Sequence, residues 1–137
     1  VVFKSSDVRH VSGPFACKVA MSRNRPPAVA RYVAQSLGFE TAQIGSAGAK
    51  AMHVLLGDYD AYVHAGGQYE WDQAAPVGVS LAAGLHASRL DGSPLTYNNA
   101  DTYIPDMVIC RPELADDILE ATHRYFSEHG TFEGVAK

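Results

Sequence analysis

The sequence lacks the features that mark membrane, secreted or nucleic-acid-binding proteins. Its two cysteines, Cys17 and Cys110, lie far apart, each in an apolar run, which is typical of buried free thiols in a reducing compartment. No apolar run approaches the roughly 18 residues that a membrane span needs, and no signal-peptide pattern opens the chain. The formal net charge of −4 gives no positive field for nucleic acid or an acidic membrane. We therefore expect a cytoplasmic protein that binds neither.

Several catalytic patterns are absent as well. The six histidines form no H-x-H or H-x-x-x-H pair, so nothing in the sequence supports a zinc site. There is no G-x-S-x-G nucleophile elbow, and the G-S-A-G segment at 45–48 lacks the G-x-G-x-x-G spacing of a dinucleotide fold. A dinucleotide-dependent enzyme therefore stays a weak alternative.

What is present is one domain's worth of ordinary globular sequence. The chain has 137 residues, of which 47% are hydrophobic and 19% charged, enough for a single core. It opens VVFKSSDVRH without an initiator methionine. We expect it to be one part of a longer protein.

Strand-like and helix-like segments alternate along the chain. Val29, Val33 and Leu37 form one helical face that Gly38 ends, and Asp91-Gly92 between extended segments is a hairpin signal. This alternation predicts an α/β fold with a largely parallel sheet flanked by helices, plus one hairpin. The expected strands are 15–21, 41–44, 60–65 and 107–111, and the expected helices follow Pro26-Pro27, cover 47–56 and about 73–84, and begin at Pro112.

Three loops are expected at the carboxyl ends of these strands, where α/β sheets bind ligands. They read SRNRPP, GSAGAK and GGQYEWD. In GSAGAK, the small residues leave backbone N–H groups open at a helix start, which favours an anion, and Lys50 lies one turn further on. The alternative is close helix–sheet packing with Ser46 as an ordinary N-cap.

The other two loops each have a functional and a structural interpretation. Arg23 and Arg25 could hold phosphate bidentately, or they could simply be solvated. Asp72 could be the N-cap of the helix that follows, or it could offer one oxygen to a hard cation such as Mg²⁺, and the two roles are compatible. Trp71 is expected to pack at the joint between strand and helix.

Four motifs together resemble the inositol monophosphatase superfamily. WDQAAP followed by VSLAAG is similar to its C-terminal signature, whereas SAGAK, SRNR and DGSPLTYN resemble loops of its 3'(2'),5'-bisphosphate nucleotidase branch. Order and approximate spacing agree over roughly residues 15–125. The resemblance implies two α/β lobes, of which residues 1–137 would be the C-terminal lobe.

The resemblance also implies site residues and a cofactor. It implies a Mg²⁺-dependent, lithium-sensitive phosphatase in which Asp72 is a metal ligand and acts in catalysis through the metal. Arg25 stands where the family usually has His, and Asn24 replaces a Ser. The family's Asp-Pro-x-Asp-Gly-Thr motif, which supplies further ligands, is not found here, so the chain alone should turn over little or nothing. The substrate-binding positions implied are Ser22, Arg23, Arg25, Gly45, Ser46, Ala47, Gly48 and Lys50.

The function expected is removal of the 3'-phosphate of 3'-phosphoadenosine 5'-phosphate, in the housekeeping of sulfur assimilation. The partners expected are a small phosphate monoester and the N-terminal lobe of the same enzyme, and a homodimer is left open. The alternatives are an inositol-phosphate or fructose-bisphosphate phosphatase and, from another class, a non-catalytic nucleotide-binding domain.

Overall fold

A five-stranded mixed sheet organises the protein. The computed structural model describes residues 17–24, 26–97 and 100–129. The strand order is β2-β1-β3-β5-β4, in which β2, β1 and β3 are parallel and β5 and β4 join antiparallel. The strands are β1 (Lys18–Ser22), β2 (Glu40–Ile44), β3 (Ala61–Tyr69), β4 (His86–Ser88) and β5 (Tyr103–Cys110).

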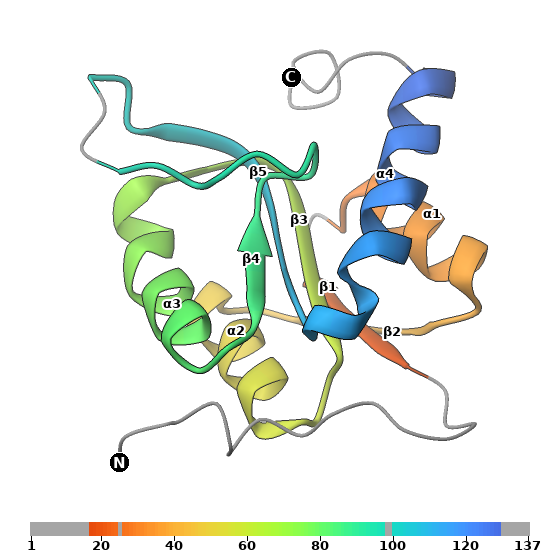
Figure 1. Ribbon diagram of the computed structural model, residues 1–137, viewed down its shortest axis with the longest axis horizontal. Helices are drawn as coiled ribbons and strands as arrows, with labels where there is room; N and C mark the ends of the chain where they lie inside the picture. Colours follow the sequence, from red (N-terminus) through yellow and green to blue (C-terminus); the bar gives the residue numbers. More distant parts are fainter. Residues whose placement is uncertain (1–16, 25, 98–99, 130–137) are drawn as a thin grey trace.

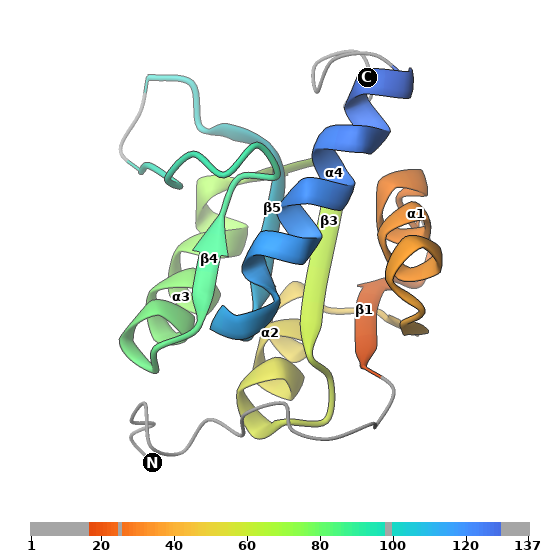
Figure 2. The ribbon, with the colours of Figure 1, turned by 45° about the vertical axis from the view of Figure 1, so that its right-hand side comes forward.

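Helices cover both faces of the sheet. In Figures 1 and 2, α1 and α4 lie on one face, whereas α2 and α3 lie side by side on the other. The α/β class with flanking helices is therefore confirmed. The helices are α1 (Ala28–Leu37), α2 (Ala47–Leu56), α3 (Glu70–Ala82) and α4 (Ala115–His129), the last preceded by the 3₁₀ turn η2 (Pro112–Leu114).

The caps that the sequence predicted form as expected at α1 and α2. Gly38 and Gly57 end these helices with φ of 70° and 87°, a left-handed conformation that glycine adopts without a Cβ penalty. The Ser46 hydroxyl accepts a hydrogen bond from Ala49 N at 3.2 Å and so caps α2. The small residues of the 45–48 segment thus begin a helix directly after β2.

The hairpin prediction is only partly right. Asp91 and Gly92 do lie in a turn, in which Gly92 N donates to Arg89 O at 3.0 Å. However, no strand follows this turn directly. β4 pairs instead with β5, which begins only after residues 89–102. In this pairing His86 lies opposite Cys110. Neighbouring residues form the turn, whereas the pairing of β4 with β5 depends on contacts between residues far apart in the sequence.

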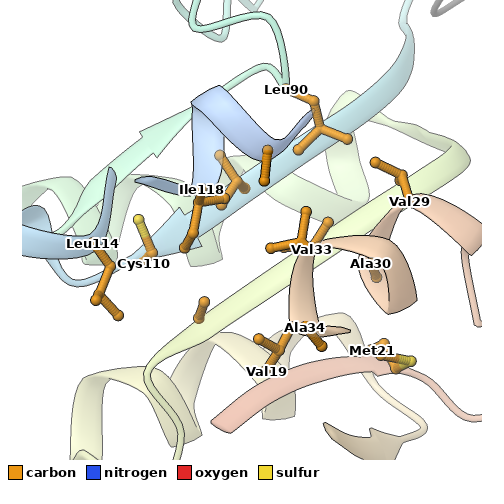
Figure 3. Packing of buried hydrophobic residues seen from close by; sticks show 14 of the residues in the cluster. Val19, Met21, Val29, Ala30, Val33, Ala34, Leu90, Cys110, Leu114 and Ile118 are labelled. Carbon is orange, nitrogen blue, oxygen red and sulfur yellow. The ribbon is translucent and has the colours of Figure 1, made fainter. Parts of the chain in front are cut away.

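Two hydrophobic clusters fill the space between the sheet and its helices. The one beneath α1 and α4, shown in Figure 3, packs Val33 and Ile118 against sheet residues such as Val19 and Cys110. Both cysteines are buried and free, as predicted, and burial raises the pKa of the Cys110 thiol to about 12. No helix in the described part of the chain has the length and apolar character of a membrane span.

Asp60 ties three strands together at the end of the sheet opposite the loops that the sequence analysis expects to bind a ligand. Its Oδ2 accepts from Lys18 N at 2.9 Å, and its Oδ1 accepts from Arg111 Nε at 3.1 Å. Lys18 begins β1, Asp60 precedes β3 and Arg111 follows β5. The Arg111 side chain is fully buried, and its Nη1 and Nη2 have no partner among the described residues. Asp60 is therefore the counter-ion of a buried cation.

We predict that Asp60→Ala lowers the free energy of unfolding by about 3–5 kcal/mol, because it leaves the buried guanidinium without its carboxylate. Urea denaturation followed by circular dichroism measures this loss. The control is Asp58→Ala, which removes an exposed carboxylate bonded to His53 at 2.9 Å and should cost no more than about 1 kcal/mol. Equal unfolding midpoints for the two variants would contradict the prediction.

Candidate functional site

The carboxyl ends of β1, β2 and β3 meet at one edge of the sheet because the three strands are parallel. Ser22 ends β1 and Ile44 ends β2. A Cβ built on Gly45 would lie 4.0 Å from Cζ of Arg23, so the Arg23 guanidinium lies beside the start of α2. Two of the three predicted loops are thus neighbours. Arg25 lies outside the described residues.

The start of α2 has the character of an anion site. The backbone N–H groups of Ala47 and Gly48 have no acceptor within the part of the chain that the structure describes. They are the free donors of the first helical turn, where the helix dipole adds positive potential. Because Arg23 lies alongside, this corner combines two sources of positive potential. Its chemistry suits a phosphate oxygen.

Lys50 has a different place from the one that the sequence suggested. It is 3% exposed, and its Nζ donates to Ile44 O at 2.9 Å and to Gly45 O at 3.1 Å. Burial and then the charge of Arg23 lower the pKa of this ammonium. Lys50 therefore ties the end of β2 to the start of α2. Its contact with a substrate stays a prediction.

Asp72 lies in the first turn of α3, but it is not the N-cap. β3 runs on to Tyr69, which pairs with Tyr103, and α3 begins at Glu70, so the prediction of a loop and a helix start at residue 73 is wrong. Asp72 Oδ2 accepts from Tyr69 N at 3.1 Å, so this side chain bonds the backbone of the N-cap residue, three positions before it. Its Oδ1 has no hydrogen bond to a described residue, and the side chain is exposed.

Trp71 does not pack at the joint between strand and helix as expected. It is 68% exposed, and its ring stacks on that of Tyr69, with centroids 4.6 Å apart and planes at 4°. The reason is geometric: Glu70, Gln73 and Val77 occupy the inner face of α3, and Trp71 is one position away from that face. The indole lies on the outer surface beside Asp72.

Tyr62, on β3, lies beside Lys50. Lys50 Nζ lies 5.1 Å from the centroid of the Tyr62 ring. Burial raises the pKa of Tyr62 to about 12; the hydrogen bond from Gln68 opposes this rise and the Asp72 charge adds to it. Gln68 Nε2 donates to the Tyr62 hydroxyl at 3.1 Å. The site therefore has a neutral phenol beside the Lys50 ammonium, a member that the sequence analysis missed.

His64 is a second missed residue. Its Nε2 lies 3.2 Å from Gly67 O; a carbonyl only accepts, so Nε2 carries the proton of the neutral ring. Burial lowers the pKa of this imidazole, while its Nδ1 is buried without a described partner. One feature of the sequence could have indicated this residue: Tyr62 and His64 alternate just before a glycine pair. In the structure, a register shift between Ala65 and Gln68 marks a bulge at that pair.

The described residues supply one carboxylate to a metal site rather than a whole centre. Asp72 Oδ1 is a hard oxygen of the kind that Mg²⁺ prefers. Within residues 17–24, 26–97 and 100–129, however, no group of three or more His, Cys, Asp or Glu side chains could hold a metal ion. Asp72 fits as a single ligand, and any complete centre needs oxygens from elsewhere.

Comparison with known proteins identifies the family. Residues 2–127 match the model of the inositol monophosphatase family. A 3'-phosphoadenosine 5'-phosphate phosphatase of Mycobacterium tuberculosis is 58% identical over 108 residues, which are 79% of this chain and 40% of that relative. The chain therefore spans less than half the length of the curated relatives that it matches.

Solved structures show the same fold. CysQ from Bacteroides thetaiotaomicron, a bacterial member of the inositol monophosphatase family, superposes with a TM-score of 0.61 at 24% identity, over 74% of this chain and 40% of that one. A LiCl-soaked inhibitory complex of Staphylococcal inositol monophosphatase-1 superposes with a TM-score of 0.62 at 18% identity, over 77% of this chain and 38% of that one. Sequence motifs, family match and fold agree, and the chain belongs to the inositol monophosphatase family.

Proposed function

We propose that this chain is the C-terminal lobe of a Mg²⁺-dependent phosphatase that removes the 3'-phosphate of 3'-phosphoadenosine 5'-phosphate. The observation that carries the proposal is the position of the Arg23 guanidinium beside the start of α2, at the carboxyl ends of the parallel strands, together with Asp72 in the first turn of the helix that follows β3. The name of the Mycobacterium tuberculosis relative supports the substrate. A cytoplasmic protein of sulfur assimilation is the setting that we propose, which the two free thiols favour.

The reaction is hydrolysis of a phosphate monoester. A water oxygen attacks phosphorus, the bond from phosphorus to the 3'-oxygen breaks, and the leaving oxygen takes up a proton, so that AMP and inorganic phosphate result. When bound, Mg²⁺ neutralises phosphoryl oxygens and lowers the pKa of the attacking water. Asp72 supplies one ligand oxygen to it, and the remaining ligands come from the N-terminal lobe of the same enzyme.

The residues of this chain bind and orient the substrate. The N–H groups of Ala47 and Gly48 and the Arg23 guanidinium hold phosphate oxygens, with Ser22, Gly45 and Ser46 lining the same corner. Lys50 positions this corner through the two carbonyls that it holds. Arg25, which lies outside the described residues, is our candidate for binding the second phosphate of the nucleotide, which an inositol monophosphate lacks.

We predict that phosphate release from 3'-phosphoadenosine 5'-phosphate with Mg²⁺ requires more than this chain. The chain alone should be inactive because it offers one metal ligand. Co-expression with the segment of the Mycobacterium tuberculosis relative that lies outside the match should give turnover that Li⁺ inhibits. In that complex Asp72→Asn should lose at least about 100-fold in kcat, since even outer-sphere partners of metals cost 10–100-fold.

The control for this assay is Asp117→Asn, which removes an exposed carboxylate on α4 and should leave kcat unchanged. Faster release from inositol 1-phosphate or fructose 1,6-bisphosphate than from the nucleotide would change the substrate assignment. An active complex in which Asp72→Asn matches Asp117→Asn would refute the role of Asp72.

We predict that Lys50→Met weakens binding of inorganic phosphate by about 10-fold or more, because hydrogen bonds of charged groups contribute about 1.5–3 kcal/mol. Hydrogen exchange of the Gly45 and Ser46 amides should also accelerate, since their carbonyl neighbours lose the ammonium that holds them. The control is Lys18→Met, whose side chain is exposed on β1. Weaker binding without faster exchange would mean that Lys50 acts by charge alone, and unchanged binding would contradict its role.

A further inference from the structure

The two oxygens of the Asp72 carboxylate have different surroundings. Oδ2 accepts from Tyr69 N at 3.1 Å, whereas Oδ1 makes no hydrogen bond to a described residue. The next amide along the chain points the other way, since Glu70 N donates to Thr102 O at 2.9 Å, beside the start of β5. Successive residues of a paired strand turn their amides alternately toward the partner strand and away from it. The direction of the Tyr69 amide therefore decides which oxygen of Asp72 is held and which is left for a metal ion.

A bulge in β3 sets the direction of that amide. β3 and β5 lie side by side (Figure 2), and between the pairings of Ala65 and Gln68 the register shifts. At this shift the glycine pair Gly66-Gly67 lies opposite a single residue of β5. One extra residue reverses the side to which every later amide of a strand points. Without the bulge, the amide that now meets the Asp72 carboxylate would face β5 instead.

The conformation of the bulge depends on the absence of a side chain at residue 67. Gly66 and Gly67 have φ of 102° and 94°, a region that residues with a Cβ rarely adopt. The Tyr103 ring occupies the space that a Cβ on Gly67 would take, because this Cβ would lie 2.6 Å from Tyr103 Cζ. In addition, His64 Nε2 donates to Gly67 O at 3.2 Å. Gly67 is therefore held by two side chains, whereas a Cβ on Gly66 would meet no atom within 4 Å.

We propose that Gly67 and Tyr103 are positioning residues for the metal ligand Asp72. The inference rests on the proposed function, in which Asp72 binds Mg²⁺. The Tyr103 ring keeps Gly67 in the bulge, and the bulge turns the Tyr69 amide toward Asp72. That amide holds Oδ2, so that Oδ1 stays available to the metal ion. Neither positioning residue needs to touch the substrate or the metal.

The orientation of Asp72 matters because its side chain is exposed and would otherwise rotate freely. The Tyr69 amide is its one hydrogen-bond partner among the described residues. Partners that orient a metal ligand are worth about 10–100-fold in metal affinity or activity. The neighbouring rings follow the same arrangement, because Tyr69 lies edge-on to Tyr103 with centroids 6.0 Å apart and stacks on Trp71. The bulge therefore orders the whole surface around the carboxylate.

Hydrogen exchange of the Tyr69 amide in this chain tests the inference. Gly67→Ala places a Cβ against the Tyr103 ring and should accelerate this exchange about 10-fold or more, because it breaks a hydrogen bond to a charged group. Gly66→Ala is the matched control, since it has a similar positive φ without the contact, and it should accelerate the exchange less. The Val108 amide, on the central part of β5, reports any global unfolding.

Tyr103 provides a second set of variants, which leave β3 itself unchanged. Tyr103→Ala removes the ring and should accelerate exchange of the Tyr69 amide, whereas Tyr103→Phe keeps the ring and should behave like the parent chain. When Tyr103→Ala is already present, adding Gly67→Ala should cost no more than Gly66→Ala does, because the clash is gone. If Gly67→Ala unfolds the chain, which the Val108 amide would show, Tyr103→Ala against Tyr103→Phe decides the inference.

The metal requirement separates a positioning role from a structural one. In the complex with the segment of the Mycobacterium tuberculosis relative, Gly67→Ala should raise the Mg²⁺ concentration at half-maximal rate about 10-fold or more above that of Gly66→Ala. An unchanged Mg²⁺ requirement despite faster exchange of the Tyr69 amide would overturn the positioning role, as would equal exchange in Gly67→Ala and Gly66→Ala. A parent complex that hydrolyses no phosphate monoester would refute the proposed function, while the exchange rates still decide whether the bulge orients Asp72.

Discussion

The buried pair of Asp60 and Arg111 is the constraint on which the sheet depends. One carboxylate receives the amide that begins β1 and the guanidinium that follows β5, while its own backbone begins β3. A cation buried this deeply is tolerated only with a counter-ion. The pair therefore fixes the three central strands at one end. Their opposite ends, where β1 and β2 stop and β3 continues, are left to build the site.

Continuation of β3 beyond its parallel neighbours decides how the site is arranged. The strand pairs with β5 as far as Tyr69, past a bulge at the glycine pair, and α3 starts one residue later. As a result, Asp72 lies in the first turn of α3, where its Oδ2 accepts from Tyr69 N. Tyr62 lies beside Lys50 and is kept neutral by burial. The extent of β3 thus determines where the exposed Asp72 carboxylate lies on α3.

The outer surfaces of the two helical layers differ in character. The outward side of α4 carries exposed charged residues, whereas large apolar side chains are exposed on α2 and α3. A single carboxylate at the rim of that apolar side cannot organise phosphoryl transfer by itself.

Local chemistry in the sequence determined most of the elements and the caps of α1 and α2. Gly38, Gly57 and Ser46 act at short range, and the four motifs that resemble the family are contiguous. Long-range pairing decided the rest. Whether Asp72 is the N-cap of α3 or bonds the N-cap residue before it depended on how far β3 pairs with β5. The absence of a strand directly after Asp91-Gly92 depended on the pairing of β4 with β5. The exposure of Trp71 and the burial of Lys50 also required the packed helices, since a sequence pattern does not show which face of a helix meets the sheet.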